Sequence, residues 1–469
     1  MSSRPQKRVI SVFVLAMINI AAICNIANLP LTAQKGFSLL FLYGVASILF
    51  FIPCALISAE LATGWPQRGG VYIWVKEALG DKASFVAIWL QWIENVVWYP
   101  TILSFIAATF AYVINPSLAE NKFYILTVIL SVYWTVTFLN LLGMKISGWI
   151  SSFCVMVGTI IPGSFIILLG ISWLILGRTP EISFTLSSLI PNFNSFENFS
   201  ILAAVLFAFS GLEMSAVHAQ EVENPQKNYP KAILLSAIVI FVITSFAALS
   251  IAIVVPELNI ELASGTIEAF RHFLDAYNLS WAVPVVAVLM VIGSMGMVST
   301  WIVGPSKGLL ATAQHGELPP FLQKTNKNRM PTHLLILQGS IVTVLAFVFL
   351  YMPNISSAYR LLLLLTSQLY LIMYILMFVS AVILRYKKPD VERAFRVPFK
   401  NTGIWIAAGM GLLACIFGLV LGFVPPKEFS HSEATFFVIF LLIGIIIFAG
   451  VPLIIHKFRK PTWHIMKDM

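Results

Sequence analysis

Twelve long apolar runs, separated by short polar connections, constrain this chain more than any other feature of its sequence. A helix needs roughly 20 mostly apolar residues to cross the hydrocarbon core of a bilayer. The runs lie at 9–33, 39–60, 84–113, 123–143, 148–176, 200–221, 232–255, 281–303, 335–352, 359–384, 403–424 and 434–455. With 59% hydrophobic and only 10% charged residues, a water-soluble domain of this length is excluded. We therefore predict an all-α polytopic membrane protein with twelve transmembrane helices.

The distribution of lysine and arginine predicts the orientation of these helices. If the N-terminus is inside, the connections on that side hold 23 of the 29 Lys and Arg residues. An asymmetry this large predicts that both termini are cytoplasmic. The basic residues are spread over membrane-proximal loops and form no single patch, so the net charge of +9 requires no nucleic-acid partner.

Several other functions lack the residues that they would need. The four cysteines lie in apolar runs without C-x-x-C spacing, which predicts neither disulfides nor a zinc site. We expect no metal and no cofactor, and without a G-x-x-x-x-G-K-[ST] motif any uphill transport must use a solute or ion gradient. The seven histidines lie in loops, tails or near helix ends, which argues against a membrane enzyme. No filter loop or charged ring indicates an ion channel.

Four glutamates lie within or at the ends of the predicted spans, namely Glu60, Glu94, Glu213 and Glu221. A carboxylate at the centre of a membrane helix costs on the order of 3 kcal/mol, so it should face a bundle interior or a wet cavity. Glu60 and Glu221 end their helices, where a water-exposed charge, a helix-end charge or a gate contact is the simpler interpretation. Glu94 and Glu213 lie deeper, and we predict that they face a pocket.

Two of the runs contain residues typical of broken membrane helices. "AAICNIANLP" (21 to 30) places Asn25 and Asn28 in an apolar run that Pro30 should end, and Ser210-Gly211 precede Glu213 in the sixth run. Gly/Ser pairs are places where membrane helices kink. Irregular segments five helices apart are typical of transporters built from inverted repeats. Ordinary helix packing also uses such residues and is the alternative.

Two further stripes of polar and aromatic residues each share one helical face. They are Gln91, Glu94 and Trp98 in the third run and Thr366, Tyr370 and Tyr374 in the tenth. Each stripe is either a seam of interhelical hydrogen bonds or interfacial anchors, or the lining of a cavity. A cavity would supply the polar partners that Tyr and Trp need at mid-depth.

Three collinear motifs carry a resemblance to a known superfamily. They are "SAELATGWPQRGGVYIWVKEALG" (58 to 80), "GLEMSAVHAQEVENPQKNYPKA" (211 to 232) and "TWIVGPSKGLLATAQHGELPP" (300 to 320). The chain resembles the amino acid-polyamine-organocation permeases over nearly its whole length, and within them the bacterial glutamate/gamma-aminobutyrate antiporter family. The resemblance implies one transmembrane domain over 1–469 with the LeuT-type fold. That fold has a five-plus-five inverted repeat, here 1–176 and 200–384, and two additional helices at 403–455.

The resemblance also implies where a substrate would bind. Spans one and six should unwind near Ile23 to Asn25 and near Phe209 to Gly211. Amides around Ile26 to Asn28 would then receive a substrate carboxylate, and carbonyls around Ile20 to Ile23 and Ala208 to Phe209 would accept from its ammonium group. The expected substrate-binding residues are Ile23, Cys24, Asn25, Ile26, Asn28, Glu94, Trp98, Phe209, Ser210, Gly211, Glu213, Met297, Tyr370 and Tyr374.

The sequence departs from the antiporter pattern at two positions. Met297 stands where the glutamate antiporters carry an acid, which puts glutamate as the substrate and acid-dependent activity in question. Glu94 matches no acid of those antiporters and favours a substrate with a distal amine.

We therefore expect an amino acid antiporter that exchanges an amino acid for a related one or for its decarboxylation product. The alternatives are a cationic amino acid or polyamine exchanger, a proton-coupled permease, and a membrane sensor without transport. The expected partners are a small amino acid or amine and the lipid bilayer of a bacterial inner membrane, and the fold allows a homodimer.

Overall fold

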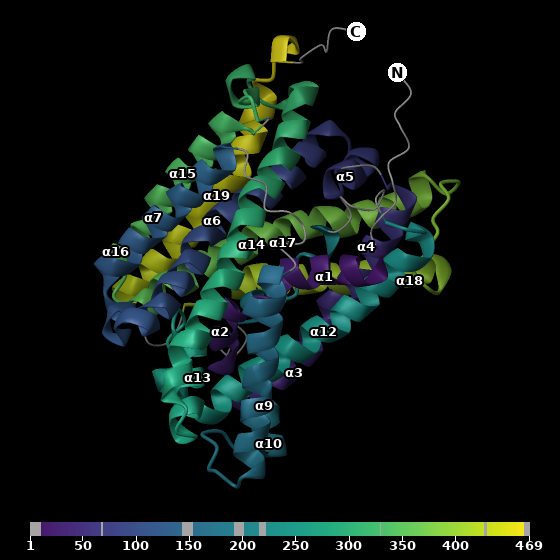
Figure 1. Cartoon of the computed structure of the whole chain (residues 1–469). Coiled ribbons are helices and arrows are strands. Elements are labelled where there is room, and N and C mark those ends of the chain that lie inside the picture. Colours follow the sequence, from purple (N-terminus) through teal and green to yellow (C-terminus); the bar gives the residue numbers. More distant parts are fainter. Residues whose placement is uncertain are drawn as a thin grey trace.

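The computed structural model describes residues 11–66, 69–142, 153–191, 201–214, 222–328, 330–425 and 429–463. Regular structure within these ranges is helical, and their single β contact is an isolated bridge between Thr325 and Pro331. Figure 1 shows two neighbouring groups of helices, one with α6, α7, α15, α16 and α19 and one with α1, α4, α12, α17 and α18. The prediction of an all-helical protein is confirmed for the described part of the chain.

Ten helical segments of the described chain are long and apolar enough to cross a membrane. They consist of α3 and α4 (Leu39–Ala46, Ile52–Gly64), α6 (Asp81–Ile114), α7 (Lys122–Leu141), the segment Phe153–Ile175 with α9 (Ile161–Ile175), α12 (Pro225–Val254), α14 (Val283–Thr312), α15 and α16 (Thr332–Ala346, Val348–Tyr351), α17 (Ile355–Lys387), α18 (Lys400–Leu421) and α19 (His431–Lys457). Each coincides with one of the predicted runs. The architecture is therefore that of a multi-pass membrane protein.

The first and sixth predicted runs are present as shorter pieces. The first run forms α1 (Val12–Ile23) and α2 (Leu29–Ala33), and the sixth begins with α11 (Leu202–Phe207). These are the two runs in which the sequence predicted a break. Three further short helices lie outside the long segments, namely α5 (Val71–Leu79), α10 (Leu186–Leu189) and α13 (Gly265–Ala276).

The long helices differ in how much protein surrounds them. In the most apolar window of α6, 83% of residues are buried inside the protein, and in that of α17 78% are buried, but in α19 the share is only 17%. Because α19 turns apolar side chains outward, it suits a lipid-facing position. Helices α6 and α17 form the centre of the molecule and can present side chains to an internal site.

Connections and helix ends on one side of the bundle contact one another and carry several exposed lysines. On this side, which we call the basic face, Lys388 Nζ lies 3.4 Å from Glu77 Oε2 and joins the end of α17 to α5. Arg459 Nη1 lies 2.7 Å from Glu317 Oε1 and joins the residues after α19 to those after α14. At the other ends of the helices, on the opposite face, Lys122 Nζ donates to the Met352 carbonyl at 2.6 Å.

A buried carboxylate ties the basic face together. Glu60, near the end of α4, forms salt bridges with Arg385 of α17 and with Arg393 of the following loop, where Arg393 Nε lies 3.3 Å from Glu60 Oε1. The Val397 amide also donates to Glu60 Oε2 at 2.8 Å. The Arg393 guanidinium lies 5.0 Å from the Trp65 ring centroid. We call Glu60, Arg385, Arg393 and Val397 the Glu60 latch, because they fix the loop after α17 to the end of α4.

Candidate functional site

The break in the first span is capped by its own asparagine. Helix α1 ends at Ile23, Cys24 and Asn25 have extended backbones, and a 3₁₀ turn follows at Ile26–Asn28. Asn25 Oδ1 accepts from the Ala27 amide at 3.0 Å. Asparagine favours such local bonds over helix continuation. The break therefore lies where the sequence predicted it.

Pro30 does not end the helix, contrary to our expectation. Helix α2 begins at Leu29 and has Pro30 in its first turn. Proline fits there because the amide that it lacks would have no partner inside the helix. In the sequence, Pro30 was thus a signal for the start of the second half of the span.

The break in the sixth span depends on a glycine. Helix α11 ends at Phe207, and Gly211 has a φ of 117°, a region that other residues rarely adopt. A Cβ atom at Gly211 would lie 3.1 Å from Ile23 Cγ1 and 3.8 Å from the Ala22 carbonyl oxygen. The two breaks are therefore in direct contact, although almost 190 residues of sequence separate them.

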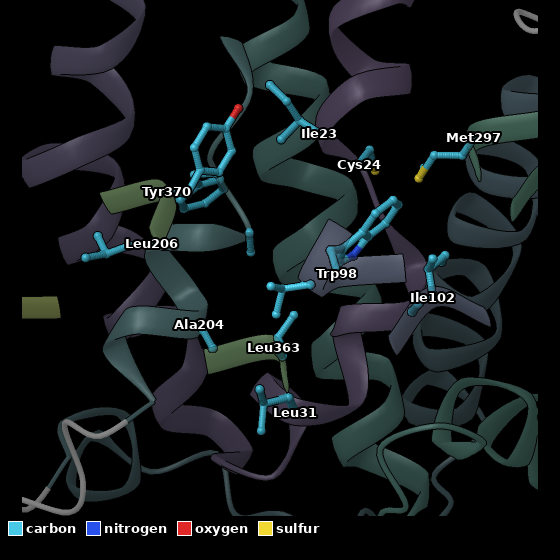
Figure 2. Packing of buried hydrophobic residues seen from close by; sticks show 14 of the residues in the cluster. Ile23, Cys24, Leu31, Trp98, Ile102, Ala204, Leu206, Met297, Leu363 and Tyr370 are labelled. Atoms are coloured by element: carbon cyan, nitrogen blue, oxygen red, sulfur yellow. The ribbon is translucent and has the colours of Figure 1, made fainter. Parts of the chain in front are cut away.

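A small cavity lies at this meeting point. Its walls come from α1 and the first break, from the middle of α6, from the second break, from α14 and from α17. The lining residues are Ala22, Ile23, Asn25, Asn28, Glu94, Asn95, Trp98, Phe207, Ser210, Met297, Trp301 and Tyr370. Figure 2 shows Ile23, Trp98, Met297 and Tyr370 of this set among the buried side chains at the centre of the molecule.

The cavity brings together eight of the fourteen residues that the sequence indicated. These are Ile23, Asn25, Asn28, Glu94, Trp98, Ser210, Met297 and Tyr370. The other six, Cys24, Ile26, Phe209, Gly211, Glu213 and Tyr374, are buried nearby but do not line it. Both stripes thus contribute to the lining, through Glu94 and Trp98 on α6 and through Tyr370 on α17.

Four lining residues were not among those expected from the sequence, although helical spacing indicates two of them. Trp301 lies one turn after Met297 on α14, and Asn95 lies next to Glu94 and one turn after Gln91 on α6. Ala22 and Phe207 had no comparable signal, because both are apolar residues in apolar helices.

Glu213 does not face the cavity as we expected, because Tyr370 lies between them. The Glu213 side chain is buried and accepts hydrogen bonds from the Tyr370 hydroxyl, from the Tyr374 hydroxyl at 2.5 Å and from Gln91 Nε2 at 3.4 Å. Among the described residues, no Lys, Arg or His forms an ion pair with it. Its contact with the cavity is therefore indirect, through Tyr370.

Tyr374 links Glu213 to the break itself. The Tyr374 hydroxyl accepts from the Gly211 amide at 2.6 Å while it donates to Glu213 Oε2. One hydroxyl thus satisfies an amide that the break leaves without a helical partner, and also one oxygen of a buried carboxylate. The two tyrosine rings contact each other, with centroids 4.9 Å apart.

Among the described residues, Glu94 is the one acidic residue that lines the cavity. Its side chain is buried, and the Asn95 amide donates to its Oε1 atom. The other described lining residues offer amide groups, hydroxyls and the indole rings of Trp98 and Trp301, and none of them is Lys, Arg or His. Such a cavity can neutralise a cationic group by a carboxylate and by the faces of aromatic rings.

Two of the amides expected to receive a substrate carboxylate already have partners. The Ala27 amide donates to Asn25 Oδ1, and the Asn28 amide donates to the Asn25 carbonyl at 3.2 Å. Asn25, whose side chain lines the cavity, thus occupies the position that we assigned to a carboxylate oxygen. Glu221, which we placed at the end of the sixth span, lies outside the described residues. No group of three or more metal-ligating side chains occurs in the described part of the chain.

The sequence also matches known proteins. The sequence model of the amino acid permease family matches residues 8–448. An uncharacterized transporter of Legionella pneumophila is 44% identical over 96% of this chain and 97% of its own. A glutamate/gamma-aminobutyrate antiporter of Lactococcus lactis is 32% identical over 97% of this chain and 92% of its own. A probable agmatine/putrescine antiporter of the same species is 24% identical over 84% and 83% of the two chains.

Proposed function

The chain belongs to the amino acid permease family, and from this premise we propose that it is an antiporter working by alternating access. It would exchange an amino acid for a related amino acid or for its decarboxylation product across the bacterial inner membrane. The observation that carries the proposal is the direct contact of two broken helices at a central cavity. Broken helices at mid-depth supply main-chain groups that bind the charged ends of a substrate.

Main-chain groups would recognise the part that all amino acids share. A substrate carboxylate would replace Asn25 Oδ1 at the Ala27 amide, where the start of the second half-helix favours negative charge. The ammonium group would bind carbonyl groups near Ile23 and Phe209. Side chains would then need only to select the substituent of the substrate.

Alternating access requires the two faces to open in turn. In this structure the opposite face has a larger cavity, whose lining includes Gln34, Glu261 and Arg360 and also the buried residues Leu31 and Leu364. The basic face is held by the Glu60 latch. We propose that the basic face is cytoplasmic, in agreement with the excess of Lys and Arg in its loops.

We also propose that spans one to five and six to ten form the two inverted repeats.

Counterflow into proteoliposomes tests the function. Vesicles containing the purified protein would be preloaded with unlabelled glutamate, gamma-aminobutyrate, agmatine, putrescine or arginine, and uptake of each labelled compound would be measured. We expect uptake only with a matching internal substrate. Uptake into unloaded vesicles would indicate a uniporter, and failure of all these compounds and of a wider amino acid panel would contradict transport. Stabilisation by a ligand without flux would indicate a sensor.

Exchange of cationic amino acids or amines is the second candidate, and the position of Glu94 favours it. Replacing Glu94 by Gln removes a charged acceptor from the cavity while it keeps the side-chain shape. A hydrogen bond to a charged group contributes about 1.5–3 kcal/mol, so binding of a cationic substrate should weaken about ten- to 100-fold. Neutral amino acids, measured in the same vesicles, serve as the control. An equal loss for neutral and cationic substrates would contradict this version but not transport itself.

A further inference from the structure

The loop between α17 and α18 holds more positive charge than its carboxylate partner can balance. Arg385 and Arg393 both pair with Glu60, and Arg396 lies close enough to lower the pKa of Arg393. Burial is the largest cause of that lowered pKa, Glu60 opposes it, and Arg385 and Arg396 add to it. Two guanidinium groups thus contact one carboxylate while a third lies near Arg393, and an additional anion would stabilise this excess of positive charge.

Two exposed cations of this loop are available to such an anion. Arg396 and Lys400 are exposed, and neither forms an ion pair with any described residue. Asp390 and Glu392 lie on the same loop and are also exposed, yet neither pairs with these cations within the described part of the chain. The free positive charge is therefore concentrated at the end of the loop that leads into α18.

Aromatic side chains place this end of the loop at the membrane boundary. Tyr386 at the end of α17 and Trp405 near the start of α18 are both about half exposed, and Trp405 Nε1 donates to the Tyr386 hydroxyl at 3.0 Å. Exposed Tyr and Trp at the ends of membrane helices lie at the level of the lipid headgroups. This pair brackets the loop, so it would bring Arg396 and Lys400 to the depth of the lipid phosphates.

Phe399 is held in a strained conformation with its ring exposed. Its side chain is 83% exposed, and Phe399 and Lys400 both have positive φ angles, 63° and 54°. Consecutive left-handed residues other than glycine are costly and persist where the surroundings favour them. The surroundings that favour an exposed phenylalanine between two cations are a bilayer surface, with acyl chains for the ring and phosphates for the charges.

We propose that Arg396, Phe399 and Lys400 bind an anionic phospholipid of the leaflet at the basic face. The lipid phosphate pairs with Arg396 and Lys400, and the Phe399 ring inserts among the acyl chains. Since Val397 of the same loop donates to Glu60, the bound lipid also stabilises the closed Glu60 latch. The surface thus links the composition of the membrane to the closing of this face.

Thermal unfolding of the purified full-length protein in detergent tests the site. Added phosphatidylglycerol should raise the melting temperature by several degrees more than phosphatidylcholine with the same chains, and inorganic phosphate should not reproduce the effect. The double substitution Arg396→Gln and Lys400→Gln should abolish this difference. Lys324→Gln with Lys327→Gln, which removes two exposed charges from the same face, is the matched control and should retain it.

Three outcomes would overturn the proposal. They are an equal response to both lipids, an equal response to inorganic phosphate, and an unchanged lipid response in the double variant. If the double variant does not fold, Lys400→Gln alone and Phe399→Ser should each reduce the response to phosphatidylglycerol about twofold or more, and a full response in both single variants would contradict the site. None of these outcomes depends on which substrate is transported.

Discussion

Two buried glutamates of this protein have opposite surroundings. Glu60 at the basic face pairs with Arg385 and Arg393, whereas Glu213 beside the central cavity is bonded to two tyrosine hydroxyls and one amide, with no cationic partner among the described residues. Two guanidinium groups hold the charge of Glu60 in place. The neutral donors around Glu213 leave its charge free to change with little rearrangement of the neighbours. The same residue type thus serves a fixed structural contact in one region and an adjustable one in the other.

Removal of the Glu60 charge should have the largest effect on stability. The substitution Glu60→Gln leaves two buried guanidinium groups with no anion, so the free energy of unfolding should fall by about 3–5 kcal/mol. Thermal unfolding of the purified protein would measure it. Glu77→Gln is the matched control on the same face, since Glu77 forms a half-exposed pair with Lys388 that should contribute about 0–1 kcal/mol. Similar losses in the two variants would mean that the Glu60 latch is not structural.

Removal of one tyrosine hydroxyl that donates to Glu213 should have an intermediate effect on stability. Tyr374→Phe leaves both the Gly211 amide and one oxygen of Glu213 without a partner, which should cost about 1–3 kcal/mol. Tyr370→Phe removes only a bond to Glu213 and is the natural comparison. We expect the Tyr374 variant to unfold at the lower temperature and to lose more counterflow activity. The reverse order would show that the amide of the break does not depend on Tyr374.

Neutralisation of Glu213 should have the smallest effect on stability. Glu213→Gln keeps the shape of the side chain and one strong acceptor oxygen, and it leaves no cation unpaired in the described structure. The free energy of unfolding should therefore change by about 1 kcal/mol or less. Unfolding measured in parallel with Glu60→Gln checks this value. A loss as large as that of Glu60→Gln would remove the distinction between the two regions.

The sequence predicted the parts of this fold that depend on local chemistry. Apolar runs marked the spans, and Asn25 and Gly211 marked the two breaks, because caps and positive φ angles are properties of single residues. The partners of Glu60 were not predictable, since Arg385 lies 325 residues away along the chain. For the same reason, nothing in the sequence showed that Tyr370 would stand between Glu213 and the cavity, because that depends on how α17 is rotated against the sixth span.

Tyr370 contacts both the cavity and Glu213. Its hydroxyl has one proton to donate, and in this structure that proton goes to Glu213 while the side chain lines the cavity. A ligand that accepted a hydrogen bond from this hydroxyl would compete with the Glu213 carboxylate for it. Protonation of the carboxylate would weaken its hydrogen bond to Tyr370 and so favour the bond to the ligand. Such competition would link occupancy of the cavity to the charge of Glu213, equally in both directions.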